Sequence, residues 1–414
     1  MDVLVVGSGA REHALCLALA RDPGVASLWC APGNAGTSKV ATNVAVVAND
    51  PTSVAELARA LGVDLVVVGP EAPLVAGVAD AVRSEGIACF GPSKAAAQLE
   101  GSKAFAKQVM TAAGVPTAAA FVCETPAEVA AALDSFGPPY VVKDDGLAAG
   151  KGVVVTSSRD EAIAHATECG RVVVEEFLDG PEVSLFVVTD GETAVPLLPA
   201  QDFKRLGDGD SGPNTGGMGA YSPLTWLEPG FVDEVMASVV HPTLREMRHR
   251  GNAFAGLLYV GLALTSRGVR VVEFNARFGD PETEVVLSLL DSPLGVLLDA
   301  AAMGRLHDAS TLQWHEGAAC TVVVAAAGYP DSPRTGDPIL GLDAAAAVEG
   351  VDVLHAGTSR VGADVVSAGG RVLAVTARGS TLREARRRAY EAVSLIDLPG
   401  SQNRGDIAQS ASAR

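Results

Sequence analysis

Short, continuous apolar runs recur through the first hundred residues, and this rhythm is the strongest constraint on the fold. Val3–Val6, Leu65–Val68 and Ile87–Phe90 are such runs, and each is followed directly by glycine. Strands that are apolar throughout are buried on both faces, which is typical of a parallel sheet covered by crossover helices. We therefore predict an N-terminal doubly wound parallel-sheet domain that binds ligands beyond the carboxyl ends of its strands.

The segments between these runs supply helices and further strands. We predict a helix over Arg11–Arg21 and strands over Leu28–Cys30 and Val44–Val47. Asp50-Pro51 combines an N-cap residue with proline at the first helical position, so another helix begins there. The strand-end loops that we expect to meet the ligand are Gly7–Glu12, Pro32–Thr37 and Gly69–Leu74.

After residue 100 strands and helices alternate differently, which predicts a second domain. Capping-box sequences at Thr125 and Ser158 begin two helices. These helices flank the predicted strands Tyr140–Lys143 and Val153–Val155, and a further strand, Val172–Glu175, follows. Together the five elements predict a small α+β lid over about residues 118–178. A larger sheet is expected from three more runs, Val183–Val188, Leu257–Leu264 and Val269–Phe274.

A third region begins near residue 317. It has predicted strands over Thr321–Ala325 and Val372–Ala377, and a capping box at Thr381 opens a helix that reaches about Ile396. The predicted domains are therefore residues 1–100, 101–316 and 317–414, in an α/β and α+β multidomain chain whose last domain is small and α+β.

Composition narrows the possible functions. A chain of 414 residues that is 48% hydrophobic can bury two or three cores. Its net charge of -18 argues against general affinity for nucleic acid or anionic membranes, although a local phosphate site remains possible. No apolar run reaches about 18 residues, so we expect no transmembrane helix.

The termini and the cysteines indicate a cytoplasmic protein. The chain starts with a predicted strand and lacks the basic start and cleavage site of a signal peptide. Its six cysteines are scattered without a Cys-x-x-Cys pair, which is typical of reduced residues. The seven histidines have no metal-ligand spacing.

Gly7–Glu12 occupies the position of a Rossmann phosphate loop, but the match is weak. Glu12 replaces the third glycine of the dinucleotide fingerprint, and no carboxylate follows the second strand. Nicotinamide binding is therefore not expected. Two interpretations remain: a single phosphate at the helix N-terminus, or a simple strand-to-helix turn.

The strongest local signal is a glycine-rich loop after a predicted strand that ends at Lys143. Gly146, Gly150 and Gly152 surround Lys151, and such glycines let the backbone approach phosphates while the lysines neutralise them. It is not a Walker loop, because the spacing is one residue short and no Ser or Thr follows the lysine. The alternative is a surface hairpin with solvated lysines.

A carboxylate, an amide and an arginine follow one another at alternate positions near the end of another predicted strand. Glu273 and Asn275 point to the same face and offer the oxygen ligands that magnesium prefers. Arg277 continues along that face and can bind phosphoryl oxygens as charge develops. The alternative is an ion-paired loop.

Three further segments give weaker evidence for a binding site when each is taken alone. The strand end at Glu175, Phe177 and Leu178 can contact an adenine, with Glu182 placed for a ribose hydroxyl, although such a run is more often only a strand end. Gln201–Arg205 and Thr215–Gly219 supply an acid for an ammonium group, two cations and free amides for a phosphate. Each of the last two can also be a solvated loop.

Together these segments resemble the phosphoribosylamine–glycine ligase family of the ATP-grasp superfamily, also called glycinamide ribonucleotide synthetases. The resemblance spans nearly the whole chain, to about residue 408, and its most specific segments are TGGMGAYSP from residue 215 and EFNARFGDPET from residue 273. It implies a substrate domain, an ATP-grasp core with a mobile lid, and a small C-terminal domain. It also implies ATP as co-substrate with Mg²⁺ or Mn²⁺, and ligation of glycine to 5-phosphoribosylamine through a glycyl phosphate in de novo purine synthesis. We expect a monomer.

The resemblance also implies roles for residues at matching positions. For ATP these are Lys103, Lys143, Gly146, Gly150, Lys151, Gly152, Glu175, Phe177, Leu178 and Glu182, with Glu273 and Asn275 for the metal. For phosphoribosylamine they are Gly9, Asn34, Glu71, Pro73, Gly217 and Met218. For glycine and the acyl phosphate they are Asp202, Lys204, Arg277 and Asp280.

The chain departs from the family pattern at three places. Asp144 stands where the family usually has alanine, and Phe203 where it often has histidine. The run Leu257–Leu264 lacks the acidic metal ligand of many ATP-grasp enzymes, so Glu273 has to serve more than one ion or phosphates and water complete the shell. Two alternatives stay open: another carboxylate–amine ligase or carboxylase of this fold, and a nucleotide-binding protein without catalysis.

Overall fold

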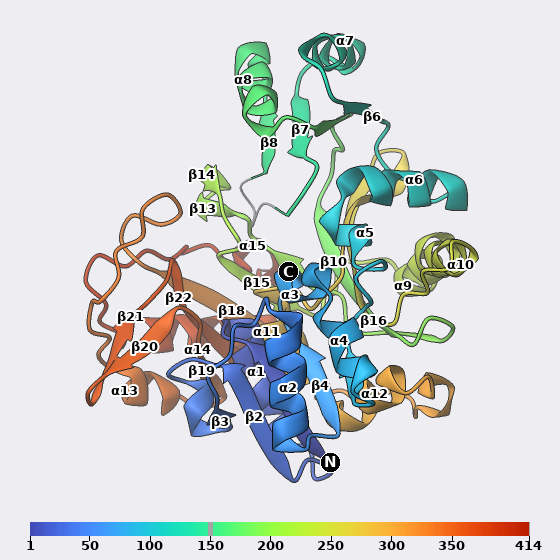
Figure 1. The fold of residues 1–414 in the computed structure, drawn as a ribbon. Coiled ribbons are helices and arrows are strands. Elements are labelled where there is room, and N and C mark those ends of the chain that lie inside the picture. The colour runs from blue at the N-terminus through green and yellow to red at the C-terminus, as the bar shows by residue number, and fades with distance from the viewer. Residues whose placement is uncertain (148–151, 414) are drawn as a thin grey trace.

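The computed structural model describes residues 1–147 and 152–413. Figure 1 shows the N-terminal elements at the bottom, the C-terminal elements at the left, and a smaller unit that rises above the rest. No helix in the described ranges is long and apolar enough to span a bilayer.

The N-terminal sheet is parallel throughout, with strand order β3-β2-β1-β4-β5, which confirms the doubly wound domain. Its strands are β1 (Asp2–Gly7), β2 (Ser27–Pro32), β3 (Thr42–Asn43), β4 (Leu65–Val68) and β5 (Ala88–Phe90). The helices of this region are α1 (Ala10–Ala20), η1 (Thr37–Lys39), α2 (Pro51–Leu61), α3 (Glu71–Ala76) and α4 (Val78–Ser84). Buried side chains of α2 and α4 pack on one face of the sheet and those of α1 on the other. Asp50 caps α2 by accepting a hydrogen bond from Thr52 N, as predicted.

The prediction of a strand over Val44–Val47 is wrong. The edge strand β3 contains only Thr42 and Asn43, which pair with Trp29 and Cys30. After Val44, whose N–H donates to Cys30 O, the chain leaves the sheet, and Val47 is 67% exposed. An edge strand has a partner on one side only, so apolar content does not by itself extend it.

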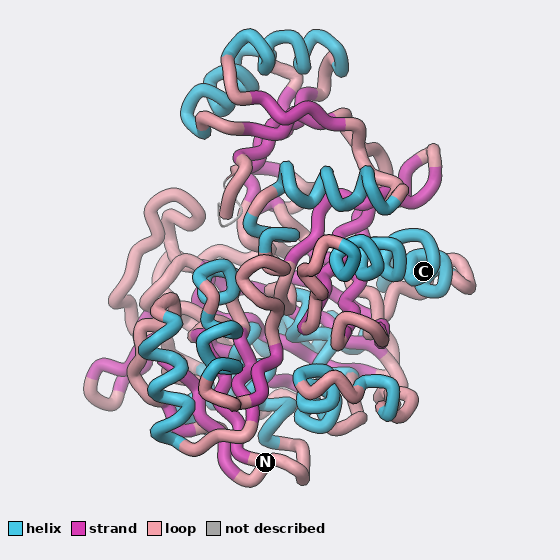
Figure 2. Tube along the Cα trace, turned by 45° about the vertical axis from the view of Figure 1, so that its right-hand side comes forward, coloured by secondary structure: helices cyan, strands magenta, loops and turns pink. Residues whose placement is uncertain are grey.

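The raised unit is a four-stranded antiparallel sheet of order β6-β9-β7-β8 with two helices on one face. Figure 2 shows these helices on the side of the sheet that faces away from the rest of the molecule. The elements are β6 (Ala120–Cys123), α7 (Pro126–Phe136), β7 (Tyr140–Asp144), β8 (Val153–Thr156), α8 (Arg159–Cys169) and β9 (Val172–Glu175). Thr125 forms both bonds of its capping box, whereas Ser158 makes only the bond to the N3 amide.

The central sheet is antiparallel, with order β11-β10-β16-β17, and it confirms the predicted larger sheet. Its strands are β10 (Glu182–Thr189), β11 (Ala194–Pro196), β16 (Gly256–Thr265) and β17 (Gly268–Asn275). The helices of this region are α5 (Gln98–Gly101), α6 (Lys103–Ala113), α9 (Phe231–Val235), the π-helix η2 (Met236–Val240), α10 (His241–His249), α11 (Glu282–Leu289), α12 (Leu294–Ala302) and η3 (Leu306–Asp308).

A third sheet, of order β12-β15-β18-β22-β19, joins the middle of the chain to its C-terminal part. It contains β12 (Gln201–Asp202), β15 (Gly219–Ser222), β18 (Ala318–Ala325), β19 (Val351–His355) and β22 (Arg371–Gly379). The remaining elements are the hairpin β13 (Arg205–Gly207) and β14 (Ser211–Asn214), the hairpin β20 (Thr358–Val361) and β21 (Asp364–Ser367), and the helices α13 (Leu342–Ala346), α14 (Leu382–Val393) and α15 (Gln409–Ser412). This sheet brings Arg371, the first residue of β22, beside loops of the middle region.

Candidate active site

One cavity of about 820 Å³ lies between the raised unit, the central sheet and the ends of the first and third sheets. Most of the predicted site residues that the structure describes line it. They are Glu71, Lys103, Lys143, Gly146, Gly152, Glu175, Phe177, Leu178, Glu182, Asp202, Lys204, Glu273, Asn275, Arg277 and Asp280. Gly150 and Lys151 fall outside the described residues.

Two lysines share one buried carboxylate at the raised side of the cavity. Glu175 on β9 lies beside β7, and its Oε2 is 2.9 Å from Lys143 Nζ, while its Oε1 is 3.1 Å from Lys107 Nζ. Burial alone would lower the pKa of Lys143, but Glu175 and Glu273 raise it, so this lysine stays charged. Lys107 was not predicted, although its position four residues after Lys103 on α6 puts both on one helix face.

The start of the glycine-rich loop is fixed to α6. Asp145 Oδ1 accepts hydrogen bonds of 3.0 Å from both Ser102 Oγ and Ala104 N, at the N-terminus of this helix. Lys103 Nζ donates to Gly146 O at 2.8 Å. The first residues of the loop, Asp145 and Gly146, are therefore held beside the cavity, and Lys103 contacts the backbone of Gly146.

Glu273 and Asn275, at the end of β17, could hold a magnesium ion together with a bound substrate. Burial raises the pKa of Glu273, but Lys204 and Lys143 outweigh burial and keep the pKa below its usual value. The ionised carboxylate and the amide oxygen both line the cavity. No cluster of three or more His, Cys, Asp or Glu side chains in the described ranges could hold a metal. Two protein oxygens suit Mg²⁺, which keeps waters and phosphates in its shell.

Arg277 is held between two carboxylates from the N-terminal part of the chain. Its Nε lies 3.2 Å from Glu71 Oε2, and its Nη2 lies 3.4 Å from Glu100 Oε1. Burial raises the pKa of Glu100 to about 7, although Arg277 opposes that rise. Burial also acts on Glu71, but Arg277 and Arg11 keep its pKa lowered. Glu100 was not predicted as a site residue, and nothing local to α5 distinguishes it.

Asp202 and Lys204 lie next to a second group of carboxylates. Burial raises the pKa of Asp202 to about 7, with Lys204 opposing the rise and Glu282 adding to it. Lys204 is hydrogen-bonded to Glu182. Glu282 Oε1 accepts a hydrogen bond from Tyr259 OH, on β16, at 2.8 Å. Neither Glu282 nor Tyr259 was predicted as a site residue.

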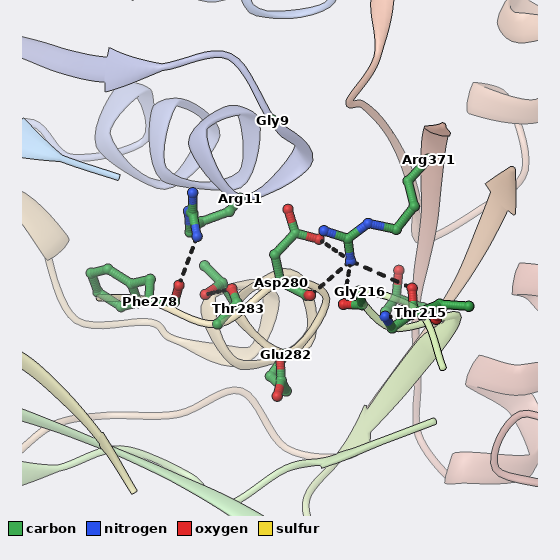
Figure 3. Close-up of polar contacts among 12 residues, drawn as sticks. Gly9, Arg11, Thr215, Gly216, Phe278, Asp280, Glu282, Thr283 and Arg371 are labelled. Atoms are coloured by element: carbon green, nitrogen blue, oxygen red, sulfur yellow. Dashed lines mark hydrogen bonds and ion pairs between the residues drawn. The ribbon is translucent and has the colours of Figure 1, made fainter. Parts of the chain in front are cut away.

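Figure 3 shows the Arg371 side chain pointing directly at Asp280, with Gly216 beside both. Arg371 Nη1 lies 3.0 Å from Asp280 Oδ1 and donates to the carbonyl oxygens of Asp280 and Gly216 at 2.8 and 2.7 Å. A Cβ on Gly217 would lie 2.4 Å from Pro281 Cδ, so only glycine allows the two loops to approach this closely. Arg371 was also not predicted as a site residue.

Five residues predicted for phosphoribosylamine do not line the cavity. Met218 is fully buried among apolar side chains, and Pro73 is buried in α3. Asn34 donates to His355 O at 2.7 Å and Ser8 O at 2.9 Å, while its Oδ1 accepts from Gly36 and Thr37 amides. These bonds use the side chain of Asn34 to hold the protein's own loops.

Gly9 and Gly217 do not line the cavity either, but both border it. A Cβ on Gly9 would lie 3.5 Å from Asp280 Oδ2, and Gly217 contacts Pro281. The roles predicted for these five residues in phosphoribosylamine binding stay predictions.

The Glu12 side chain fills the turn between β1 and α1, where a Rossmann loop would bind a phosphate. Its carboxylate accepts a hydrogen bond from Gly9 N and pairs with Arg11 Nε. A Cβ on Gly69 would lie 2.1 Å from Glu12 Oε1, so the side chain fills the turn. An anion already sits at this helix N-terminus, which favours the interpretation as a strand-to-helix turn over a phosphate site.

Glu284 is a buried acid with neither carboxyl oxygen hydrogen-bonded to any described residue. Burial, and secondly the charge of Asp280, raise its pKa well above the usual value of 4.5. Between the pKa of the unfolded chain and that of the folded protein, the folded state therefore keeps the Glu284 proton and the unfolded chain loses it. The free energy of unfolding should fall by up to about 1.4 kcal/mol per pH unit as pH rises from the unfolded pKa towards the folded one.

We expect Glu284→Gln to raise the melting temperature at about pH 8 and to flatten its decline with pH. The amide keeps the shape of the neutral acid and cannot ionise. Thermal unfolding followed from about pH 5 to pH 9 measures the effect, with the exposed Glu316→Gln as the control. A parallel pH profile for Glu284→Gln and the parent chain would contradict the expectation.

Comparisons with known proteins agree with this architecture. Three family models match: phosphoribosylglycinamide synthetase N domain over residues 1–100, its ATP-grasp (A) domain over 101–283 and its C domain over 319–410. The chain is 67% identical over 413 residues to the phosphoribosylamine–glycine ligase of Streptomyces coelicolor, covering 99% of both proteins. It is 58% identical over 418 residues to that of Mycobacterium tuberculosis, covering 98% of this chain and 97% of the relative.

A solved structure of the Thermotoga maritima phosphoribosylamine–glycine ligase matches with a TM-score of 0.85 at 36% identity, covering 99% of this chain and all of that one. Biotin carboxylase from Campylobacter jejuni shares the fold alone, with a TM-score of 0.73 at 14% identity, over 97% of this chain and 92% of that one. With these matches over nearly its full length, the chain belongs to the phosphoribosylamine–glycine ligase family, whose domain models carry the name phosphoribosylglycinamide synthetase.

Proposed function

We propose that this chain joins glycine to 5-phosphoribosylamine at the expense of ATP, and forms glycinamide ribonucleotide, ADP and phosphate in purine biosynthesis. The observation that carries the proposal is the convergence of Lys143, Glu273, Asn275 and Arg277 on one cavity, in a chain that is 67% identical to a ligase of that name. A carboxylate is a poor electrophile, so its phosphorylation by ATP provides a leaving group for attack by the amine.

We assign the nucleotide to the side of the cavity beneath the raised unit. Lys103 and Lys143 lie beside the glycine-rich loop and neutralise phosphate charge. Phe177 and Leu178 line the cavity next to Glu175 and offer apolar contact to the adenine ring. Closure of the raised unit over the site would exclude water, which would otherwise hydrolyse a glycyl phosphate.

We assign the glycine and acyl phosphate to the opposite side. Arg277 remains fully charged between Glu71 and Glu100 and can stabilise negative charge on the transferring phosphoryl group. Asp202, when ionised, can accept hydrogen bonds from the glycine ammonium group, while Lys204 and Asp280 complete the polar wall.

Glu273 and Asn275 would hold Mg²⁺ or Mn²⁺ together with the nucleotide phosphates. The bound ion would neutralise charge that develops on those phosphates. The support for this assignment is an ionised carboxylate and an amide oxygen on the same face of β17.

We also propose that the protein acts as a monomer in the cytoplasm. All the residues assigned above belong to one chain, so the site requires no second copy. The six cysteines are free and five of them are buried, which suits a reducing compartment.

The first test is ADP formation by the purified protein with ATP and magnesium. Glycine and freshly generated phosphoribosylamine are added separately and together. We expect strong ADP release only with both, together with a product that has the mass of glycinamide ribonucleotide. ADP release that does not depend on glycine would point to another carboxylate or to bicarbonate, and absence of turnover despite ATP binding would favour a non-catalytic nucleotide-binding protein.

A further inference from the structure

The C-terminal segment of the chain places a fully buried arginine behind one wall of the cavity. Arg404 is 1% exposed and does not itself line the cavity. Its Nε and Nη2 each lie 2.7 Å from a carboxylate oxygen of Asp406, while its Nη1 lies 2.7 Å from Asp210 Oδ1 and donates to Arg205 O at 3.3 Å. Because a guanidinium that binds one carboxylate through two nitrogens has a fixed orientation, Arg404 joins the C-terminal segment to the hairpin of β13 and β14 in a defined geometry.

Two further hydrogen bonds attach the same segment to the turn of this hairpin. Gly405 N donates to Asp208 Oδ1 at 2.7 Å, and Asp406 Oδ2 accepts from Gly209 N at 2.8 Å. Asp210, in the same turn, has a φ of 54°, in the left-handed region that residues with a side chain adopt infrequently. Contacts from outside the hairpin therefore help to hold its turn in this shape.

The guanidinium group also lies over an aromatic ring in the segment that leads into the hairpin. Arg404 Cζ is 4.9 Å from the centroid of the Phe203 ring. The residues on either side of Phe203, Asp202 and Lys204, line the cavity, whereas Phe203 does not. Alternate side chains of an extended chain point to opposite sides, so Arg404 contacts the back of the segment whose front carries Asp202 and Lys204. A displacement of Phe203 therefore moves both cavity groups through the backbone that they share.

Glycine offers only an ammonium group and a carboxylate for recognition, so its binding depends on the exact placement of the few groups that meet it. We propose that Arg404 is a positioning residue for glycine, which holds Phe203 and the β13–β14 hairpin from the C-terminal segment and thereby fixes Asp202 and Lys204 at the substrate. The proposal rests on the proposed function, which assigns Asp202 and Lys204 to glycine and the acyl phosphate, and adds to it a residue that touches no substrate.

The first test is the steady-state kinetics of ligation by Arg404→Met. Methionine keeps apolar contact with Phe203 but loses every hydrogen bond to the hairpin. We expect kcat/KM for glycine to fall by roughly 10- to 100-fold, mainly through a higher KM for glycine, because small displacements of binding groups have effects of this size. The KM for ATP should change much less, since Arg404 contacts no residue assigned to the nucleotide. An unchanged KM for glycine, or equal increases in both KM values, would overturn the proposal.

Arg386→Met is the matched control. Arg386 binds the same C-terminal segment, with hydrogen bonds of 2.6 Å to Gly405 O and 2.9 Å to Ile407 O. Its guanidinium group also lies over an aromatic ring, that of Tyr390, but among the described residues it makes no hydrogen bond or ion pair with the hairpin. The KM for glycine should be unchanged in this variant. An increase equal to that of Arg404→Met would assign the effect to general loosening of the C-terminal segment and overturn the proposal.

A double-mutant cycle tests the route through Phe203. Phe203→Leu leaves every charge in place, so it remains informative if Arg404→Met does not fold. It should raise the KM for glycine by a smaller factor, because the ring beneath the guanidinium group is lost. If Arg404 acts through this ring, the double variant should lose less kcat/KM for glycine than the product of the two single losses. Losses that multiply, or a normal KM for glycine in Phe203→Leu, would overturn the proposal.

Amide hydrogen exchange separates this proposal from failure of the proposed function. The amides of residues 205–214 should exchange faster in Arg404→Met than in the parent chain or in Arg386→Met, whether or not the protein ligates glycine. Equal exchange in all three proteins would show that the hairpin is held without Arg404 and would overturn the proposal. If the parent chain makes no product while exchange changes as expected, the proposed function fails and the assignment to glycine is overturned with it, whereas the contact of Arg404 with the hairpin stands.

Discussion

Arg277→Ala should lower kcat/KM for ligation by about 10²- to 10³-fold, the size of effect seen when a group that stabilises transition-state charge is removed. Arg277 is the cation shared by Glu71 and Glu100 on one side of the cavity. Its loss also leaves the partly buried Glu71 and Glu100 without their shared cation, although Glu100 keeps the hydrogen bond from Ala276 N, so the cost in stability should be at most about 3–5 kcal/mol. The measurements are ligation kinetics and thermal unfolding of the same preparation.

Arg277→Lys separates the two effects. Lysine keeps a positive charge between Glu71 and Glu100, so we expect Arg277→Lys to recover most of the lost stability. It should recover little of the ligation rate, because the two parallel N–H groups of the guanidinium are lost. Arg305→Ala is the control, since Arg305 pairs with Asp299 on an exposed surface. Near-normal ligation by folded Arg277→Ala would mean that the catalytic assignment is wrong.

Glu273→Gln should lower kcat by about 10²- to 10³-fold, equivalent to the several kcal/mol that a metal contributes to charge stabilisation. Glutamine keeps the shape and one oxygen but removes the charge that Lys204 and Lys143 hold in the ionised form. The magnesium concentration needed for half-maximal activity should rise in the same variant.

Nucleotide binding gives a second readout for Glu273. In the parent chain magnesium should strengthen ATP binding, and Glu273→Gln should lose most of that gain while binding metal-free ATP equally well or better. Glu349→Gln is the control, because the Glu349 side chain is exposed and remote from the cavity. An unchanged effect of magnesium on ATP binding in Glu273→Gln would remove this residue from the metal site.

The sequence by itself determined the kinds of domain and the strongest local signals of the site. The apolar runs at Val3–Val6 and Leu65–Val68 became adjacent parallel strands, because strands buried on both faces must be apolar throughout. Glu273 and Asn275 line the cavity together, because alternate residues of a strand share one face. These features depend on short-range periodicity, which a single sequence displays.

Only the tertiary structure decided which other charges meet at the site. Glu100 and Arg371 come from different parts of the chain, and nothing local distinguishes them from other charged residues. Lys107 and Glu282 lie close in sequence to predicted site residues, but their ion pair and hydrogen bond come from other elements. Glu12 fills its own turn, Asn34 is used by neighbouring loops, and Val44–Val47 leaves the sheet because no further strand pairs with it. Partners and burial set the charge state and availability of each group, and both arise from contacts between residues that are far apart in the sequence.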